Sequence, residues 1–161
     1  MKDKFQMVGT KINEFSLPNN FGDTIPIRSY LGKSNVVVIL LRDILWPFCR
    51  AHVKKLAADY EKFVEKNVAL YPILVDNLNN AQRMHTTFAK RKFPIFYDSD
   101  ENIAKKVLNQ EWKIFKLGRM PALIVVDKNQ IIHYAHYGDN MHDIPENEEV
   151  LAVLDRINNN K

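Results

Sequence analysis

The feature that most constrains this chain is its longest uninterrupted apolar run, the six residues Val36 to Leu41. The run is far shorter than the ~20 apolar residues of a membrane-spanning helix. Its valines and isoleucine favour a strand, and the lack of polar alternation indicates that both faces of that strand are covered. The run therefore predicts a sheet held between two other layers, as in α/β proteins.

Strand-like and helix-like segments alternate along the rest of the chain. In chain order we expect a hairpin over 15–27, a strand over 36–41, a helix over 47–66, a strand over 68–75, a helix over 79–92, a short strand over 94–97, a helix over 101–108, a hairpin of strands over 122–126 and 131–137, and a helix over 145–157. Strand–helix–strand units require parallel strand pairs, whereas the closing hairpin requires an antiparallel pair. We therefore expect an α/β fold with a central mixed β-sheet flanked by helices and an N-terminal β-hairpin extension.

Length and composition indicate one globular domain over residues 1–161. With 46% hydrophobic and 26% charged residues, the chain has the proportions of an ordinary soluble protein. Its net charge of +4 is modest. The basic cluster Lys90-Arg91-Lys92 ends a predicted helix, where cations are favoured in any case. We expect neither nucleic acid nor a membrane as a partner.

The cysteine content indicates the cellular compartment in which we expect the protein. Cys49 is the single cysteine, so an intramolecular disulfide is impossible and every zinc site that needs two cysteines is excluded. The N-terminal residues lack the apolar stretch of a secretory signal. These features favour a reducing compartment, and we expect a cytoplasmic protein.

The segment from Arg42 to Arg50 is the first candidate for chemistry, because it joins the buried strand to the next helix. Pro47 suits the first helical position, which places Cys49 in the first turn. There the helix dipole lowers the pKa of a thiol, and nearby arginines add to the effect. The alternative is a structural thiol, since Cys49 also lies on the apolar face of the helix and free cysteines are often buried.

The histidines are weaker candidates. His133 and His136 lie three residues apart on a predicted strand and therefore point to opposite faces. His136 and His142 flank a loop that also holds Asp143, but spacing alone implies no ligand geometry, and we expect no metal site.

His52, three residues after Cys49, is a neighbour of the thiol on the same helix. It either pairs with Cys49 or is a polar residue at the helix edge.

Two motifs carry a resemblance to a known family. The first is Arg-x-x-x-Trp-Pro-Phe-Cys-Arg over 42–50, and the second is Gly-Arg-Met-Pro-Ala over 118–122. Together they resemble the thioredoxin-fold peroxiredoxins, more narrowly the peroxiredoxin-like members of the alkyl hydroperoxide reductase/thiol-specific antioxidant group. The resemblance extends over nearly the whole chain, from Val8-Gly9 to His136-Tyr137-Gly138. It implies a thioredoxin-like fold, which agrees with the order of elements above.

The chain departs from the family at the position that matters most. In the family the cysteine that attacks peroxide stands directly before the proline that opens the helix, and here that residue is Trp46. The family's Thr or Ser, three residues earlier, is Asp43, and its preceding proline is Ile39. Cys49 matches instead the second cysteine of a Cys-x-x-Cys pair, without its partner.

The resemblance also implies roles for residues around Cys49. Pro121 is expected to be a cis proline that faces the start of the helix. Arg119 matches an arginine that helps to bind peroxide, with a surface arginine before a strand as the alternative. The further candidates for contact with a substrate or partner are Arg42, Trp46, Pro47, Phe48 and Arg50.

Two functions remain open. The first is a thiol-dependent antioxidant enzyme, an oxidoreductase that reduces hydroperoxides or exchanges disulfides through Cys49. It would use an external thiol reductant or redox partner protein and no metal, flavin or nucleotide cofactor, and a homodimer is compatible with it.

The second is a degenerate, non-catalytic thioredoxin-fold protein that binds a partner at the corner formed by Trp46–Cys49 and Pro121. Exposure of the thiol distinguishes the two. A thiol that solvent reaches favours the enzyme, and a thiol packed under the helix favours the binding protein.

Overall fold

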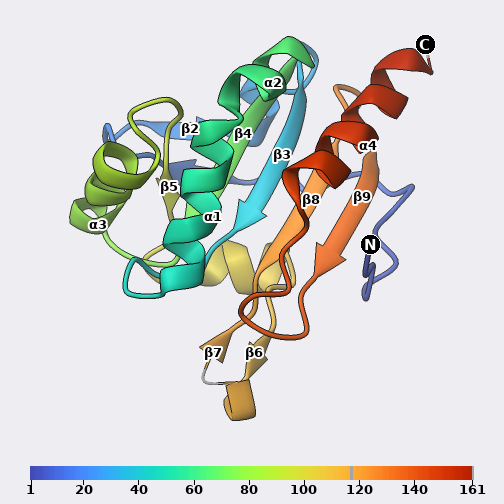
Figure 1. Cartoon of the computed structure of the whole chain (residues 1–161). Coiled ribbons are helices and arrows are strands. Elements are labelled where there is room, and N and C mark those ends of the chain that lie inside the picture. Colours follow the sequence, from blue (N-terminus) through green and yellow to red (C-terminus); the bar gives the residue numbers. More distant parts are fainter. Residues whose placement is uncertain (117, 161) are drawn as a thin grey trace.

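A five-stranded mixed sheet forms the centre of the computed structural model, which describes residues 1–116 and 118–160. The strand order is β5-β4-β3-β8-β9 (Figure 1). The strands are β3 (Asn35–Leu40), β4 (Val68–Leu74), β5 (Phe96–Tyr97), β8 (Ala122–Val126) and β9 (Ile132–Tyr137). β3 and β5 run parallel to β4, whereas β8 is antiparallel to both β3 and β9. The predicted mixed sheet is confirmed.

Helices cover one face of the sheet. They are α1 (Pro47–Ala58), α2 (Tyr60–Glu65), α3 (Leu78–Arg83) and α4 (Asn147–Asn159), and Figure 1 shows α1 and α4 lying across the strands. Their apolar side chains meet those of Val37 and Ile39 in one core, to which α1 contributes Val53 and Leu56 and α4 contributes Leu154.

The N-terminal part of the chain covers the other face. The hairpin of β1 (Ser16–Pro18) and β2 (Thr24–Pro26) is the expected extension, and a short 3-10 helix, η1 (Ile27–Ser29), follows it. The second core joins Phe15 and Ile27 of this layer to Val36 and Val38 of β3. Each face of β3 is therefore buried against a different layer, as its unbroken apolar sequence predicts.

Three of the predicted helices are interrupted or are partly replaced by π-helical segments. The helix expected over 47–66 breaks at Asp59, and the one expected over 79–92 continues from α3 into a π-helix, η2 (Met84–Phe88). The helix expected over 101–108 is a single π-helical segment, η3 (Ile103–Val107). Apolar periodicity detects the buried face of such segments but not a change in their hydrogen-bonding pattern.

One element has no counterpart among the predictions. β6 (Trp112–Lys113) and β7 (Gly118–Arg119) form a short antiparallel pair, and the 3-10 helix η4 (Ile114–Lys116) follows β6. Figure 1 shows this hairpin projecting from one end of the sheet. Trp112, Ile114 and Phe115 are exposed there, so no buried face marks the segment in the sequence.

Across residues 1–116 and 118–160, every helix is too short or too polar to cross a bilayer.

Because both faces of β3 are buried, a large-to-small substitution in this strand is expected to leave a cavity and to lower the free energy of unfolding. Ile39 is 0% exposed, so Ile39→Ala is expected to lower the free energy of unfolding by about 2–5 kcal/mol. The control is Ile114→Ala, the same change at a side chain that is 72% exposed, for which we expect a change within about 0.5 kcal/mol. Urea unfolding measures both, and equal losses in the two variants would contradict this packing.

Candidate functional site

The turn between β3 and α1 builds the candidate site. The sheet pairing extends past β3, because Leu41 donates to the carbonyl of Ile73 and Val75 donates to that of Arg42. The chain then turns, and Trp46 has extended backbone angles before Pro47 starts α1. The missing N–H of Pro47 has no cost at this helix start. Cys49 therefore lies in the first turn of α1, as predicted.

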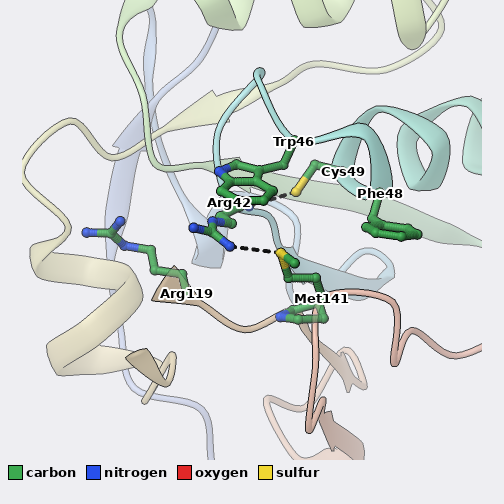
Figure 2. A pocket seen from close by; sticks show the side chains of 7 residues that line it. Arg42, Trp46, Phe48, Cys49, Arg119 and Met141 are labelled. Carbon is green, nitrogen blue, oxygen red and sulfur yellow. Dashed lines mark hydrogen bonds between the residues drawn. The ribbon is translucent and has the colours of Figure 1, made fainter. Parts of the chain in front are cut away.

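Seven residues from three stretches of the chain meet at this turn. We call this set the corner (Figure 2), and its members are Arg42, Trp46, Phe48, Cys49, Arg119, Pro121 and Met141. The cavity between them measures about 10 Å³, which is no more than one water molecule needs. The corner is closed as it stands, with no room for a peroxide.

Cys49 is packed inside the corner. It is 7% exposed, and its Sγ accepts a hydrogen bond of 3.1 Å from the backbone N–H of Arg42. The pKa of the thiol is raised to about 11, because burial, with a smaller contribution from Asp43, outweighs the backbone N–H and the charges of Arg42 and Arg50, which lower it. Desolvation thus outweighs the helix start, and the thiol keeps its proton at neutral pH.

Trp46 occupies the position directly before Pro47, which the sequence analysis matched to the peroxide-attacking cysteine of the family that the chain resembles. The Arg42 guanidinium carbon lies 3.4 Å from the centre of a Trp46 ring, and Nη1 of Arg42 donates to Sδ of Met141 at 3.0 Å. A Cβ atom on Gly118 would lie 2.3 Å from Nη2 of Arg42. Glycine at 118 therefore leaves the space in which the arginine head lies against Trp46.

Arg119 lines the corner but is directed away from the thiol (Figure 2). Its guanidinium forms an ion pair with Glu101 and lies 5.2 Å from the Trp112 ring. Arg119 also lines a neighbouring open cavity of about 380 Å³, together with Gln110 and Lys105. In this conformation the predicted peroxide-binding arginine does not face Cys49.

The remaining predicted residues divide into two groups. Phe48 lines the corner, is 41% exposed, and has its ring centre 5.3 Å from that of His142. Pro47 starts the helix and does not line the corner. Arg50 lies outside it, with its guanidinium 5.8 Å from the Phe88 ring.

Pro121 lines the corner as predicted, but the expected cis bond is wrong. The peptide bond before Pro121 is trans, because none of the described peptide bonds is cis. The backbone is anchored on both sides of it. Met120 donates to the carbonyl of Glu111, and the carbonyl of Pro121 accepts from Gly138. This segment runs extended from β7 into β8, so no turn is required there and the favoured trans form is kept.

His52 does not pair with Cys49. It is buried, and neither ring nitrogen has a hydrogen-bond partner among the described residues. Burial lowers its pKa to about 4, and the ring is neutral at physiological pH. The prediction of a residue at the helix edge is also wrong, since His52 lies inside the fold.

An acid–histidine pair joins the end of β9 to the loop that follows it. His136 Nε2 lies 2.9 Å from Asp143 Oδ1, and Lys2 Nζ lies 2.6 Å from Asp143 Oδ2. His133 is exposed on the opposite side, as strand alternation predicts. Across the described ranges 1–116 and 118–160, no three His, Cys, Asp or Glu side chains are grouped to hold a metal ion.

The sequence analysis missed two residues of the site, Met141 and Glu101. Met141 lies in the loop after β9 and Glu101 precedes η3. Both reach the site through contacts between segments distant in sequence, and neither carries a local motif. No pattern in the sequence could have selected them.

The chain has relatives among known protein families. The model of the AhpC/TSA family matches residues 8–135. Among curated proteins, no sequence matches significantly.

Solved structures of peroxiredoxins resemble the fold closely. The reduced 2-Cys peroxiredoxin of Plasmodium vivax has a TM-score of 0.82 at 18% identity, covering 96% of this chain and 98% of that one. Peroxidoxin BcpB of Mycobacterium tuberculosis has a TM-score of 0.80 at 16% identity, covering 94% and 97%. The yeast mitochondrial 1-Cys peroxiredoxin has a TM-score of 0.79 at 21% identity, covering 94% and 76%. At these identities the likeness shows a thioredoxin-like fold.

The raised pKa of Cys49 predicts a loss of stability at alkaline pH. The unfolded thiol ionises near pH 9, whereas the folded thiol keeps its proton to about pH 11. The stabilisation is therefore fully present below pH 9 and is lost as pH rises to 11. Two pKa units correspond to roughly 3 kcal/mol. Urea unfolding of wild type and Cys49→Ala across this range should show that extra loss in wild type alone, and parallel pH profiles would contradict it.

The helical spacing of Trp46 and Cys49 predicts a second result. Residues three apart at a helix start have Cβ atoms about 5–6 Å apart, within reach of a disulfide after slight adjustment. Trp46→Cys is therefore expected to form an internal disulfide with Cys49 on mild oxidation, measured as loss of both free thiols without dimer formation. The matched control, Phe48→Cys, places the new thiol one residue before Cys49 and should stay reduced. Two persistent free thiols in Trp46→Cys would mean that the two side chains do not face each other.

Proposed function

The chain belongs to the AhpC/TSA family, whose membership supports a thiol-dependent peroxidase or antioxidant function in general, and on this premise we propose that Cys49 is its single reacting thiol. The observation that carries the proposal is the environment of Sγ. It lies in the first turn of α1, beside a backbone N–H and in a corner with two arginines. Once solvent enters, these groups stabilise a thiolate and a developing alkoxide.

The reaction consists of two exchanges. The Cys49 thiolate attacks one oxygen of a hydroperoxide, the O–O bond breaks, and the alkoxide leaves as an alcohol after taking a proton. The sulfur loses two electrons and becomes a sulfenic acid. An external thiol then displaces water to form a mixed disulfide. A second external thiol releases Cys49 as a thiol and leaves the reductant as a disulfide.

Opening of the corner has to precede the first exchange. With a thiol pKa of about 11, roughly one molecule in 10,000 carries the thiolate at pH 7. The Arg42–Trp46 stack contributes only about 0.5–2 kcal/mol. Taken by itself, the loss of this stack would leave an open state populated at roughly 3–30%. We assign Trp46 the role of a gate over Cys49.

Burial of the thiol favours a second candidate function. Cys49 is packed under Trp46, which is the arrangement expected of the non-catalytic binding protein. Leu45 is 77% exposed and Phe48 is 41% exposed beside the corner. In this alternative these two side chains and Pro121 contact a partner protein, and Cys49 is part of the core.

Titration with hydrogen peroxide, followed by intact mass, tests the first proposal. Reduced wild type is expected to gain one oxygen, which added thiol removes, while Cys49→Ser gains none. Trp46→Ala should be oxidised roughly tenfold faster or more, because removing part of the burial brings the thiol pKa back towards its ordinary value.

The control is Phe21→Ala, which removes an exposed aromatic side chain from the turn between β1 and β2, outside the corner. Oxidation of wild type and Trp46→Ala no faster than that of a free cysteine would contradict a redox role and favour the binding protein.

A further inference from the structure

Arg119 stands between two cavities. Arg119 lines both the closed corner that holds Cys49 and the open cavity of about 380 Å³.

Glu101 holds the guanidinium in the open cavity. The two side chains form an ion pair, and the face of Trp112 lies 5.2 Å from the guanidinium carbon. Lys105 Nζ lies 3.9 Å from the other carboxylate oxygen of Glu101. Figure 2 shows the result, with the head of Arg119 pointing away from Cys49.

The backbone at Glu101 is unusual for a residue with a side chain. Its φ of 59° lies in the left-handed region, which residues with a Cβ rarely adopt. The surrounding turn fixes this geometry. The N–H of Glu101 donates to the carbonyl of Asp98, and Asp98 Oδ2 accepts from the N–H of Ala104 at 2.8 Å. The carboxylate is therefore presented to Arg119 by a constrained turn.

The charges around Arg119 also favour its present position. Burial lowers the pKa of its guanidinium, while Asp43 and Asp98 raise it. Arg42 carries a like charge beside it. Asp43 acts on Arg119 from beside the corner, but while Cys49 is a neutral thiol none of the seven residues that line the corner is an anion, and Arg42 among them is a cation.

We propose that Glu101 is a positioning residue that holds Arg119 away from Cys49, so that Arg119 turns into the corner only when an anion forms there. This proposal rests on the proposed function, because it takes Cys49 as the group whose anion Arg119 meets. The Glu101–Arg119 pair then competes directly with the thiolate for one cation. Breaking the pair releases that cation to the corner.

The test measures ionisation of Cys49 without any peroxide. The ultraviolet absorbance of the thiolate is followed against pH, with Cys49→Ser as the blank for tyrosine ionisation. Glu101→Gln is expected to lower the midpoint by about half a pH unit or more, since an added cation near a thiol favours its charged form. The control Glu65→Gln makes the same charge change at an exposed residue of α2 and should leave the midpoint unchanged.

A cycle with Arg119→Met separates positioning from simple removal of a negative charge. If Glu101 acts through Arg119, Glu101→Gln causes no shift in the Arg119→Met background. An unchanged midpoint in Glu101→Gln, an equal shift in Glu65→Gln, or a shift that persists without Arg119 would each overturn the proposal. Urea unfolding confirms that each variant is folded. Because no peroxide is used, failure of the redox function and failure of this positioning role are observed separately.

Discussion

All the side chains of β3 are buried, with Val37 and Ile39 against the helical layer and Val36 and Val38 against the N-terminal layer. A strand with no solvent-facing side needs two covering layers, and in this chain they come from segments on either side of it in the sequence. The strand also fixes where the chain must turn. Once Leu40 ends the strand, the next residues leave the sheet at its carboxyl edge and α1 has to begin there.

This edge determines the chemistry that the chain can perform. A helix that starts at the end of a central strand presents its first turn to the loops that follow β7 and β9, so Pro121 and Met141 line the corner with Cys49 there. In this chain the position before Pro47 carries an indole, which stacks on Arg42 and closes the corner. One side chain thus turns an electropositive helix start, which normally lowers a thiol pKa, into a dry site that raises it.

The two arginines of the corner already have partners. Arg42 lies against Trp46 and Met141, and Arg119 is paired with Glu101. Each of these contacts is worth little by itself beside the cost of ionising a buried thiol. The state of the site therefore depends on several weak contacts that can be exchanged, while the sheet beneath them stays fixed by its two cores.

Much of the architecture can be predicted from local sequence. The apolar run at 36–41 indicates a doubly covered strand, Pro47 marks the start of α1, and the turn residues of 19–23 mark the first hairpin. These features are encoded within a few residues, because strand burial, proline geometry and turn conformation act over that distance. The position of Cys49 in the first helical turn follows from the same local rules.

The exposure, side-chain direction and protonation of the site residues depend on tertiary contacts and not on local sequence. The sequence identifies Cys49, Arg119 and Pro121 as neighbours through family resemblance, yet it does not reveal that the thiol is protonated, that Arg119 faces Glu101, or that the bond before Pro121 is trans. Burial, side-chain direction and choice of ion-pair partner depend on which distant segments pack together. The sequence by itself determined where the candidate site residues lie along the fold, and the tertiary structure alone decided their exposure and charge, because desolvation and Coulomb interactions depend on distances in space.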